Sequence, residues 1–276
     1  MQYYKSIGII GHLGMVGATT LNFFRDEGYE VYGYDIREPA SKEKAFNADL
    51  IFICVPTPFD WGKDKFDGSI VEETLNLCNE KSVIVVKSTV MIGTIDQLQS
   101  KHPNKKLLFN PEFLSEATCD NDFRNPDRQF VGYTEQSYSE AIKVLNTLPE
   151  SAYGAIMPAK EAELLKYINN IHGCIEIMES NLWWEICQKE GLNYENVLKS
   201  ALASKWVGVP MGRHYRVIFH KGKRGFGGKC FPKDINAYIE YLNKSGIDAQ
   251  LPNAVREMNK RILKEQDLNE EQSEKL

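Results

Sequence analysis

The stretch Gly11-His12-Leu13-Gly14-Met15-Val16-Gly17 decides the fold of this chain. It follows the apolar run Ser6–Ile10 and opens a helical pattern. Glycines at such a turn let the backbone approach a pyrophosphate, and the N-terminus of the next helix supplies N–H donors and a positive dipole. The spacing is Gly-x-x-Gly-x-x-Gly instead of the usual Gly-x-Gly-x-x-Gly, so a simple tight turn is the alternative interpretation.

A second signal for dinucleotide binding is an acidic residue farther along the chain. Asp35 ends the run Glu30–Tyr34, 18 residues after Gly17. A carboxylate at this position accepts hydrogen bonds from ribose hydroxyls and repels a 2′-phosphate, which favours NAD over NADP. Thr57 and Thr89 follow the next two apolar runs and place hydroxyls at the same edge of the predicted sheet. We therefore expect NAD as the cofactor, although a single Thr is more often a strand end or helix cap.

Short apolar runs alternate with helical patterns through the first part of the chain. The runs are Ser6–Ile10, Glu30–Tyr34, Leu50–Val55, Val83–Lys87, Lys106–Phe109 and Gln129–Gly132. Strands that alternate with helices are typical of βαβ units with helices on both faces of a parallel sheet. The sequence thus predicts an α/β fold, with a Rossmann-type doubly wound parallel sheet over residues 1–157.

From Pro158 the pattern becomes helical. Ala159–Glu190 is one long helical stretch whose apolar residues cover much of its circumference, which predicts burial against more than one neighbour. Shorter helical patterns follow at Tyr194–Leu202, about Pro232–Ser245 and about Pro252–Lys264. We expect an all-helical domain over residues 158–265, built on a long central helix, and a frayed polar tail over residues 266–276.

The composition excludes several classes of protein. A net charge of −5 and a pI near 5.7 argue against a nucleic-acid-binding surface. No apolar run is long enough to span a membrane, and the N-terminus does not resemble a signal peptide. The six cysteines are scattered, without Cys-x-x-Cys pairs or histidines at ligand spacing. We expect a cytoplasmic protein with no metal site and no disulfide framework.

One cysteine has surroundings that indicate reactivity. Cys230 lies in Gly225-Phe226-Gly227-Gly228-Lys229-Cys230-Phe231-Pro232-Lys233-Asp234, after a glycine-rich bend and at the start of a predicted helix. The helix dipole and the two neighbouring lysines favour the thiolate. Beside NAD, such a thiolate can add to an aldehyde and form a thioester after hydride loss. A lone cysteine is more often a small buried apolar residue, but these neighbours favour a nucleophile.

Two further pairs lie four residues apart and therefore share a helix face. Lys166 and Asn170 are suited to stabilising a developing oxyanion, although such a pair is commonly only a solvated face. Glu112 and Glu116 follow the fifth apolar run and can orient substrate or move protons. Acidic pairs at helix starts otherwise serve to balance the dipole.

These motifs together resemble the UDP-glucose/GDP-mannose dehydrogenase family along nearly the whole chain. The matching stretches are Val55-Pro56-Thr57-Pro58, Lys87 to Thr94, Asn110 to Glu116, Pro126-Asp127-Arg128, Glu163 to Asn170 and Gly225 to Asp234. The resemblance implies a four-electron oxidation of a nucleotide sugar, UDP-glucose to UDP-glucuronate, with two molecules of NAD. It also implies a homodimer through the long helix 159–190.

The resemblance assigns roles by position. Catalysis falls to Cys230 as nucleophile, with Lys166, Asn170, Asp234 and Glu116. The cofactor site comprises Gly11, Gly14, Met15, Val16, Gly17, Asp35, Thr57, Thr89, Glu116 and Lys233. Substrate contacts comprise Glu112, Phe113, Leu114, Lys166, Asn170, Phe219, Lys223 and Gly227.

The sequence departs from the family pattern in three places. The chain stops before the family's C-terminal domain that holds uridine diphosphate, which predicts a compact form or one completed by another chain. The segment Arg37–Ala48 is short, and Val209-Pro210-Met211 occupies the place of the family's Arg-Ile-Gly, leaving Arg213 or Arg216 as substitutes.

Two other functions stay open on these residues. One is a two-electron dehydrogenase of β-hydroxyacids, which uses Lys166 and has no need of Cys230. The other is a non-catalytic or partner-dependent NAD-binding module. The intact set of Lys166, Asn170, Cys230 and Asp234 favours an enzyme.

Overall fold

The chain forms two compact units. The computed structural model describes residues 2–204, 207 and 216–275. Unit 1 comprises Met1–Pro58 and Asp67–Lys166, and unit 2 comprises Phe59–Phe66 and Tyr167–Leu276. The division therefore falls within the long helix, and a short segment from the first half of the sequence belongs to the second unit.

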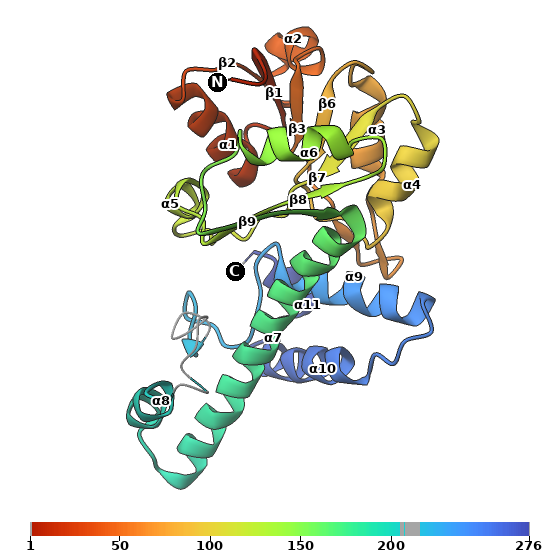
Figure 1. Cartoon of the computed structure of the whole chain (residues 1–276). Coiled ribbons are helices and arrows are strands. Elements are labelled where there is room, and N and C mark those ends of the chain that lie inside the picture. The colour runs from red at the N-terminus through yellow and green to blue at the C-terminus, as the bar shows by residue number, and fades with distance from the viewer. Residues whose placement is uncertain (1, 205–206, 208–215, 276) are drawn as a thin grey trace. The chain divides into compact units, whose positions relative to one another are not determined.

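Unit 1 is built on a sheet that has seven strands in the described part of the chain (Figure 1). The strands are β1 (Ser6–Ile10), β2 (Glu30–Tyr34), β3 (Leu50–Ile53), β6 (Val83–Val86), β7 (Lys106–Phe109), β8 (Arg128–Tyr133) and β9 (Tyr153–Pro158). They lie in the order β2-β1-β3-β6-β7-β8-β9, and all neighbours are parallel except β7 and β8. The predicted Rossmann-type sheet is confirmed, with one antiparallel pair that the sequence pattern did not show.

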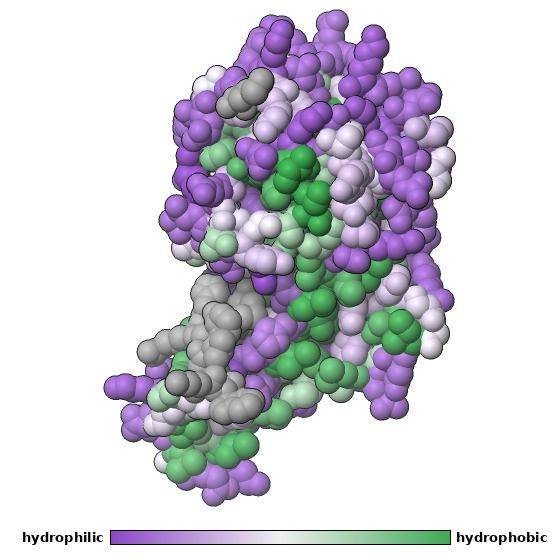
Figure 2. Space-filling view, viewed as in Figure 1, coloured by the Kyte–Doolittle hydropathy of each residue, from purple (hydrophilic) through white to green (hydrophobic). Residues whose placement is uncertain are grey.

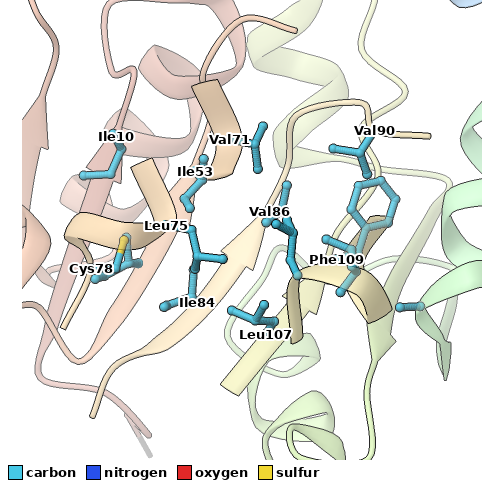
Figure 3. Packing of buried hydrophobic residues seen from close by; sticks show 14 of the residues in the cluster. Ile10, Ile53, Val71, Leu75, Cys78, Ile84, Val86, Val90, Leu107 and Phe109 are labelled. Carbon is cyan, nitrogen blue, oxygen red and sulfur yellow. The ribbon is translucent and has the colours of Figure 1, made fainter. Parts of the chain in front are cut away.

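Helices cover both faces of this sheet, because the central strands are apolar on both sides. The helices of unit 1 are α1 (Met15–Asp26), the 3-10 helix η1 (Pro39–Ser41), α2 (Lys42–Phe46), α3 (Ser69–Leu77), α4 (Thr94–Lys101), α5 (Cys119–Arg124), α6 (Tyr138–Leu145) and the first turns of α7 (Ala159–Glu190). Figure 3 shows one of the two resulting cores, where Ile53 and Val86 from neighbouring strands meet Leu75 of α3. All residues of β3 and β6 are buried.

The edge strand β9 was not predicted. It contains Gly154 and ends at Pro158; its two ends are exposed, and residues 155–157 between them are partly buried. An edge strand needs only one partner and so tolerates proline; here Gly154 and Pro158 enclose a short apolar run, residues 155–157. The sequence signal for this strand was therefore weak.

Unit 2 is helical, as predicted. It contains the rest of α7, followed by α8 (Tyr194–Leu202), α9 (Phe231–Lys244), α10 (Gln250–Lys264) and α11 (Glu270–Ser273). The long helix α7 runs unbroken over the predicted range. One side of it packs with α9 and α10 through Ile171, Cys174 and Ile177. No helix in the described part of the chain is long and apolar enough to cross a membrane.

A two-stranded hairpin from the first half of the sequence joins unit 2. It consists of β4 (Phe59–Asp60) and β5 (Lys65–Phe66), and it packs on α9. The N–H of Phe66 donates to the Glu240 carboxylate at 2.8 Å. The Trp61 indole donates to Glu274 at 3.1 Å. Two-residue strands leave no periodic pattern, so the hairpin was not predicted.

The expectation of a frayed C-terminal tail is wrong. Asn269 and Gln272 form a reciprocal capping box at the start of α11. Ser273 is buried, and its carbonyl accepts a hydrogen bond from Gly228 N–H at 2.8 Å. Polar composition suggested fraying, but these specific hydrogen bonds order the segment.

Candidate active site

The glycine turn after β1 has the geometry of a pyrophosphate cradle. Gly11 has a positive φ of 86°, and a Cβ on it would lie 2.4 Å from the Cys54 carbonyl oxygen. A Cβ on Gly17 would lie 2.2 Å from the Gly11 carbonyl oxygen. The first turn of α1, which begins at Met15 with Gly14 as N-cap, carries no acidic residue. Its N–H groups and positive dipole thus remain suited to a phosphate group.

The carboxylate predicted to hold the cofactor ribose is present and has an unexpected partner. Asp35 is buried, and it accepts hydrogen bonds from Arg37 Nε at 2.9 Å and Nη2 at 3.2 Å. The side-chain hydrogen bond from Arg37 lowers the pKa of Asp35 to about 2, against the opposing effect of burial. Sequence reasoning missed this guanidinium, although it lies only two positions away.

The two threonine segments lie side by side at the carboxyl ends of β3 and β6. Thr57 and Thr89 are both buried. The Ser88 hydroxyl donates to the Val55 carbonyl at 2.7 Å and so joins the two segments. This edge of the sheet is where cofactors bind in open α/β folds.

The structure pairs Lys166 with Glu112, two residues that the sequence analysis placed in different motifs. Lys166 Nζ donates to a Glu112 carboxylate oxygen and to the Glu112 main-chain oxygen, both at 2.8 Å. The second carboxylate oxygen accepts from Leu114 N–H at 2.9 Å. Burial raises the pKa of Glu112, but the charge and hydrogen bond of Lys166 outweigh it and leave the pKa below its usual value. The ammonium is therefore ion-paired and does not project alone into a pocket.

A cavity of about 280 Å³ adjoins the loop that follows β7. Glu112, Phe113, Lys87 and Arg128 contribute to its lining. Lys87 is 3% exposed, donates to the Asn110 side chain and lies 5.3 Å from the Phe123 ring centre. Burial lowers the pKa of Lys87 to about 8. Neither this lysine nor the arginine was singled out from the sequence as a site residue.

The second group of predicted catalytic residues lies in unit 2, around the start of α9. Cys230 is the N-cap residue of α9 and is half-buried. Asp234, in the first turn, is fully buried and accepts a hydrogen bond of 2.6 Å from the Asn170 amide of α7. Lys233 forms an ion pair with the same carboxylate. The structure thus brings Asn170, Asp234 and Lys233 together beside the helix turn that begins at Cys230.

The glycine-rich loop before Cys230 is held by residues that the sequence did not indicate. Asn259 of α10 accepts from Phe226 N–H at 2.8 Å and donates to the Phe226 carbonyl at 3.0 Å. Gln266 makes the same kind of double contact with the main chain of Arg224, at 2.8 and 3.1 Å. Asn259 lies within α10 and Gln266 just after it, without a motif around either residue, so no sequence signal marked these two.

The remaining predicted residues have varied environments. Phe219 is half-exposed with its ring edge-on to Trp184, and Lys223 pairs through its main chain with His220. Glu116 lies exposed after the β7 loop, and Gly227 is partly buried in the loop before Cys230.

Two arginines were candidates to replace the family's Arg. Arg213 lies outside the described residues, as does the Val209-Pro210-Met211 segment. Arg216 is buried and ion-paired with Glu176 and, at 3.4 Å, with Glu179. Its guanidinium also lies over the Trp183 ring, 4.7 Å from the ring centre. These internal partners favour a structural role for Arg216.

Comparison with known proteins gives consistent matches in both units. Residues 38–148 match the NAD binding domain of the UDP-glucose/GDP-mannose dehydrogenase family, and residues 160–261 match its central domain. A UDP-glucose 6-dehydrogenase of Pseudomonas aeruginosa is 31% identical over 230 residues, which cover 78% of this chain and 49% of that protein. The chain therefore spans about half the length of the curated relatives it matches.

Solved structures agree with this assignment. A UDP-glucose dehydrogenase from Pyrobaculum islandicum superposes with a TM-score of 0.79 at 26% identity, covering 96% of this chain and 72% of the other. A 3-hydroxyisobutyrate dehydrogenase of Mycobacterium tuberculosis has a TM-score of 0.68 at 16% identity and covers 91% of both chains. The second likeness shows a shared fold alone.

Proposed function

Because the chain belongs to the UDP-glucose/GDP-mannose dehydrogenase family, we propose that it oxidises a nucleotide sugar, UDP-glucose to UDP-glucuronate, with NAD⁺. The observation that carries this proposal is the hydrogen bond between Asn170 and Asp234 beside the helix turn that starts at Cys230. A buried carboxylate that is held by an amide and an ammonium in the first turn of the helix starting at Cys230 is suited to acyl chemistry, which a two-electron dehydrogenase does not need.

The two units contribute different groups to the reaction. Unit 1 contributes the glycine turn, Asp35, Thr57 and Thr89 for the cofactor, whose bound nicotinamide supplies the hydride acceptor in both oxidations. It also contributes Lys166 and Glu112. Unit 2 contributes the thiol and its polar neighbours. The glycine positions that a Cβ would fill, and the acid-free first turn of α1, support cofactor binding in unit 1.

The first oxidation converts the C6 hydroxymethyl group of the sugar into an aldehyde. The Lys166–Glu112 pair accepts the hydroxyl proton as the C6 hydride leaves. The two groups share a hydrogen bond, so the proton can move between them without entering water. Glu112, Phe113 and Leu114 position the sugar, and Phe219, Lys223 and Gly227 contact the rest of the substrate.

The second oxidation passes through a covalent adduct. The Cys230 thiolate attacks the aldehyde carbon and forms a thiohemiacetal, whose oxyanion accepts a hydrogen bond from the Asn170 amide. Loss of the second hydride gives a thioester. Water then attacks the thioester carbonyl, with Asp234 or Glu116 accepting its proton, and the thiol leaves as the carboxylate product forms.

We further propose that a homodimer forms through α7, in the cytoplasm. Leu164, Ile168, Leu182 and Ile186 are exposed large apolar residues at helical spacing along α7. Figure 2 shows hydrophobic side chains reaching the surface over this helix. Such a stripe is typical of a helix that packs against a partner.

The test of the reaction is to incubate the protein with NAD⁺ and a panel of UDP- and GDP-sugars, and to measure NADH and acid product. We expect two molecules of NADH for each molecule of acid formed. Cys230→Ala is expected to lower acid formation by roughly 10³-fold or more, while Cys119→Ala, at another half-buried thiol, leaves it unchanged.

Two outcomes contradict the proposal. One NADH per sugar with full activity in Cys230→Ala indicates a two-electron dehydrogenase. NAD binding without turnover of any nucleotide sugar indicates a non-catalytic or partner-dependent module.

A further inference from the structure

Glu163 is a fully buried acidic residue on α7, three residues before Lys166. It is 0% exposed. One carboxylate oxygen accepts a hydrogen bond from Gly93 N–H at 2.5 Å, and the other accepts from Ile95 N–H at 2.9 Å. Both donors belong to the start of α4, where Gly93 is the N-cap residue with a positive φ of 91° and has no side chain of its own to cap the helix.

The segment that Glu163 holds is the loop from Lys87 to Thr94. This loop leaves the carboxyl end of β6, carries the proposed cofactor residue Thr89, and enters α4. Val90, one residue farther along, is buried in the sheet core. Two anchors therefore set the course of the loop, namely the apolar core at Val90 and the Glu163 carboxylate at Gly93.

The first turns of α7 are themselves tightly seated in unit 1. Ala159 and Ala162 belong to the sheet core, and a Cβ on Gly132 of β8 would lie 2.9 Å from the Ala159 Cα. Lys166, one turn after Glu163, reaches the loop after β7 through its contacts with Glu112. Neighbouring turns of one helix thus hold two adjacent loops at the carboxyl edge of the sheet.

A carboxylate that caps a helix from a buried position must give up its hydration, which costs free energy when it is ionised. Burial raises the pKa of Glu163 to about 7, although the two N–H groups act in the opposite direction. The other charged groups near it are Asp96 of α4, which raises this pKa, and Lys160 of α7, which lowers it; the two form an ion pair of 3.2 Å. A serine or asparagine at the start of α4 would cap the helix without burying a charge.

We propose that Glu163 is a positioning residue that holds the Thr89 loop in register with the turn of α7 that carries Lys166. The proposal rests on the cofactor site and reaction proposed above. It assigns the carboxylate a role in cofactor affinity through the backbone of the loop, with no direct contact to the cofactor.

The test uses Glu163→Gln in the full chain, with Glu161→Gln as a matched control at an exposed position in the first turn of α7. Glutamine keeps one acceptor oxygen but turns an NH₂ group toward an N–H donor, so one of the two hydrogen bonds is lost. We expect the Kd for NADH, measured by fluorescence, to rise about tenfold in Glu163→Gln, the factor that loss of one hydrogen bond of ordinary strength produces. The KM for NAD⁺ should rise by the same factor, with kcat changed less than about threefold.

A pH series separates positioning from a merely structural role. In the wild type, protonation of Glu163 near pH 7 removes one acceptor, so NADH affinity is expected to fall between pH 8 and pH 6. The glutamine variant should show a flat profile over this range and match the wild type at pH 6. If the glutamine variant does not fold, Glu163→Asp replaces it. The shorter side chain withdraws the carboxylate by one methylene, so its Kd for NADH should also exceed that of the wild type at pH 8.

An unchanged Kd for NADH in a folded Glu163→Gln protein overturns the inference, even if its melting temperature falls. A flat wild-type profile across pH 6–8 together with an unchanged Kd for NADH in Glu163→Asp overturns it as well. If the wild-type protein binds NADH but oxidises no nucleotide sugar, the proposed function is wrong. The role of Glu163 is then decided by the NADH-binding measurements alone.

Discussion

The buried side chain of Asn259 offers a quantitative test of how the loop before Cys230 is held. Asn259 is fully buried on α10 and makes two hydrogen bonds to the main chain of Phe226, at 2.8 and 3.0 Å. Asn259→Ala removes both and leaves a buried N–H and a buried carbonyl without this partner. Each lost hydrogen bond to a buried group costs about 1–2 kcal/mol, so we expect the free energy of unfolding to fall by about 3 kcal/mol.

This loss is measurable by thermal and denaturant unfolding. For a chain of this size, about 3 kcal/mol corresponds to a fall in Tm of roughly 6–12 °C. Asn243→Ala, at an exposed position on α9, is the control and should change Tm by less than about 1 °C. A fall of less than about 2 °C in Asn259→Ala refutes the argument that these two hydrogen bonds hold the loop.

The same variant tests the connection from the loop to the thiol. Gly225 lies next to the contact, because a Cβ on it would come within 2.5 Å of the Asn259 Oδ1. A loosened loop should expose Cys230 more often, so we expect faster alkylation of this thiol by iodoacetamide in Asn259→Ala at a temperature where the protein remains folded. An unchanged alkylation rate, measured by peptide mass spectrometry, contradicts this connection.

Three further predictions concern unit 1. Gly17→Ala places a Cβ 2.2 Å from a main-chain oxygen and is expected to abolish NADH binding in a fluorescence titration, whereas Gly154→Ala, with its nearest contact at 3.6 Å, should bind NADH normally. Because the pKa of Glu163 in the folded chain is about 7, above its usual 4.5, its contribution to stability is complete below about pH 4.5 and is lost as the pH rises through 7. Urea unfolding at pH 5.5 and pH 8 should therefore show a loss of about 2 kcal/mol in the wild type that is absent in Glu163→Gln; equal losses in both proteins would speak against it. Arg37 holds both oxygens of Asp35 and offsets repulsion of a 2′-phosphate, so Arg37→Ala is expected to raise the KM for NADP⁺ several-fold relative to that for NAD⁺. A constant ratio of the two KM values would show that this guanidinium plays no part in cofactor choice.

Most of the sheet and all the longer helices were predictable from local patterns. Apolar runs such as Val83–Val86 are buried on both faces, so they are easy to recognise as central strands. The elements that were missed are short or lie at an edge. The hairpin Phe59–Phe66 has strands of only two residues, and the strand Tyr153–Pro158 has a short apolar run between a glycine and a proline. Helix α11 depends on a capping box within a polar segment.

The candidate catalytic residues could be picked out from the sequence, but the side chains that they contact could not. The resemblance to the family marked Lys166 and Glu112 separately, and the structure joins them in an ion pair 54 positions apart in the chain. Asn170 and Asp234, 64 positions apart, are joined in the same way. Asn259 and Arg37 carried no signal, since their roles depend on what lies opposite them.

The sequence by itself determined the Rossmann-type sheet, the long helix, the glycine turn followed by Asp35 and the position of Cys230 at a helix start. Each of these follows from spacing within a few turns or one strand–helix unit, where backbone geometry relates neighbours directly. Only the tertiary structure decided that Glu163 caps a helix 70 positions away, that Lys166 is neutralised by Glu112 and that a polar C-terminal segment orders the loop before Cys230. These contacts depend on which surfaces the packed core brings together, because a charge or an amide acquires its role from the group that it faces when water is excluded.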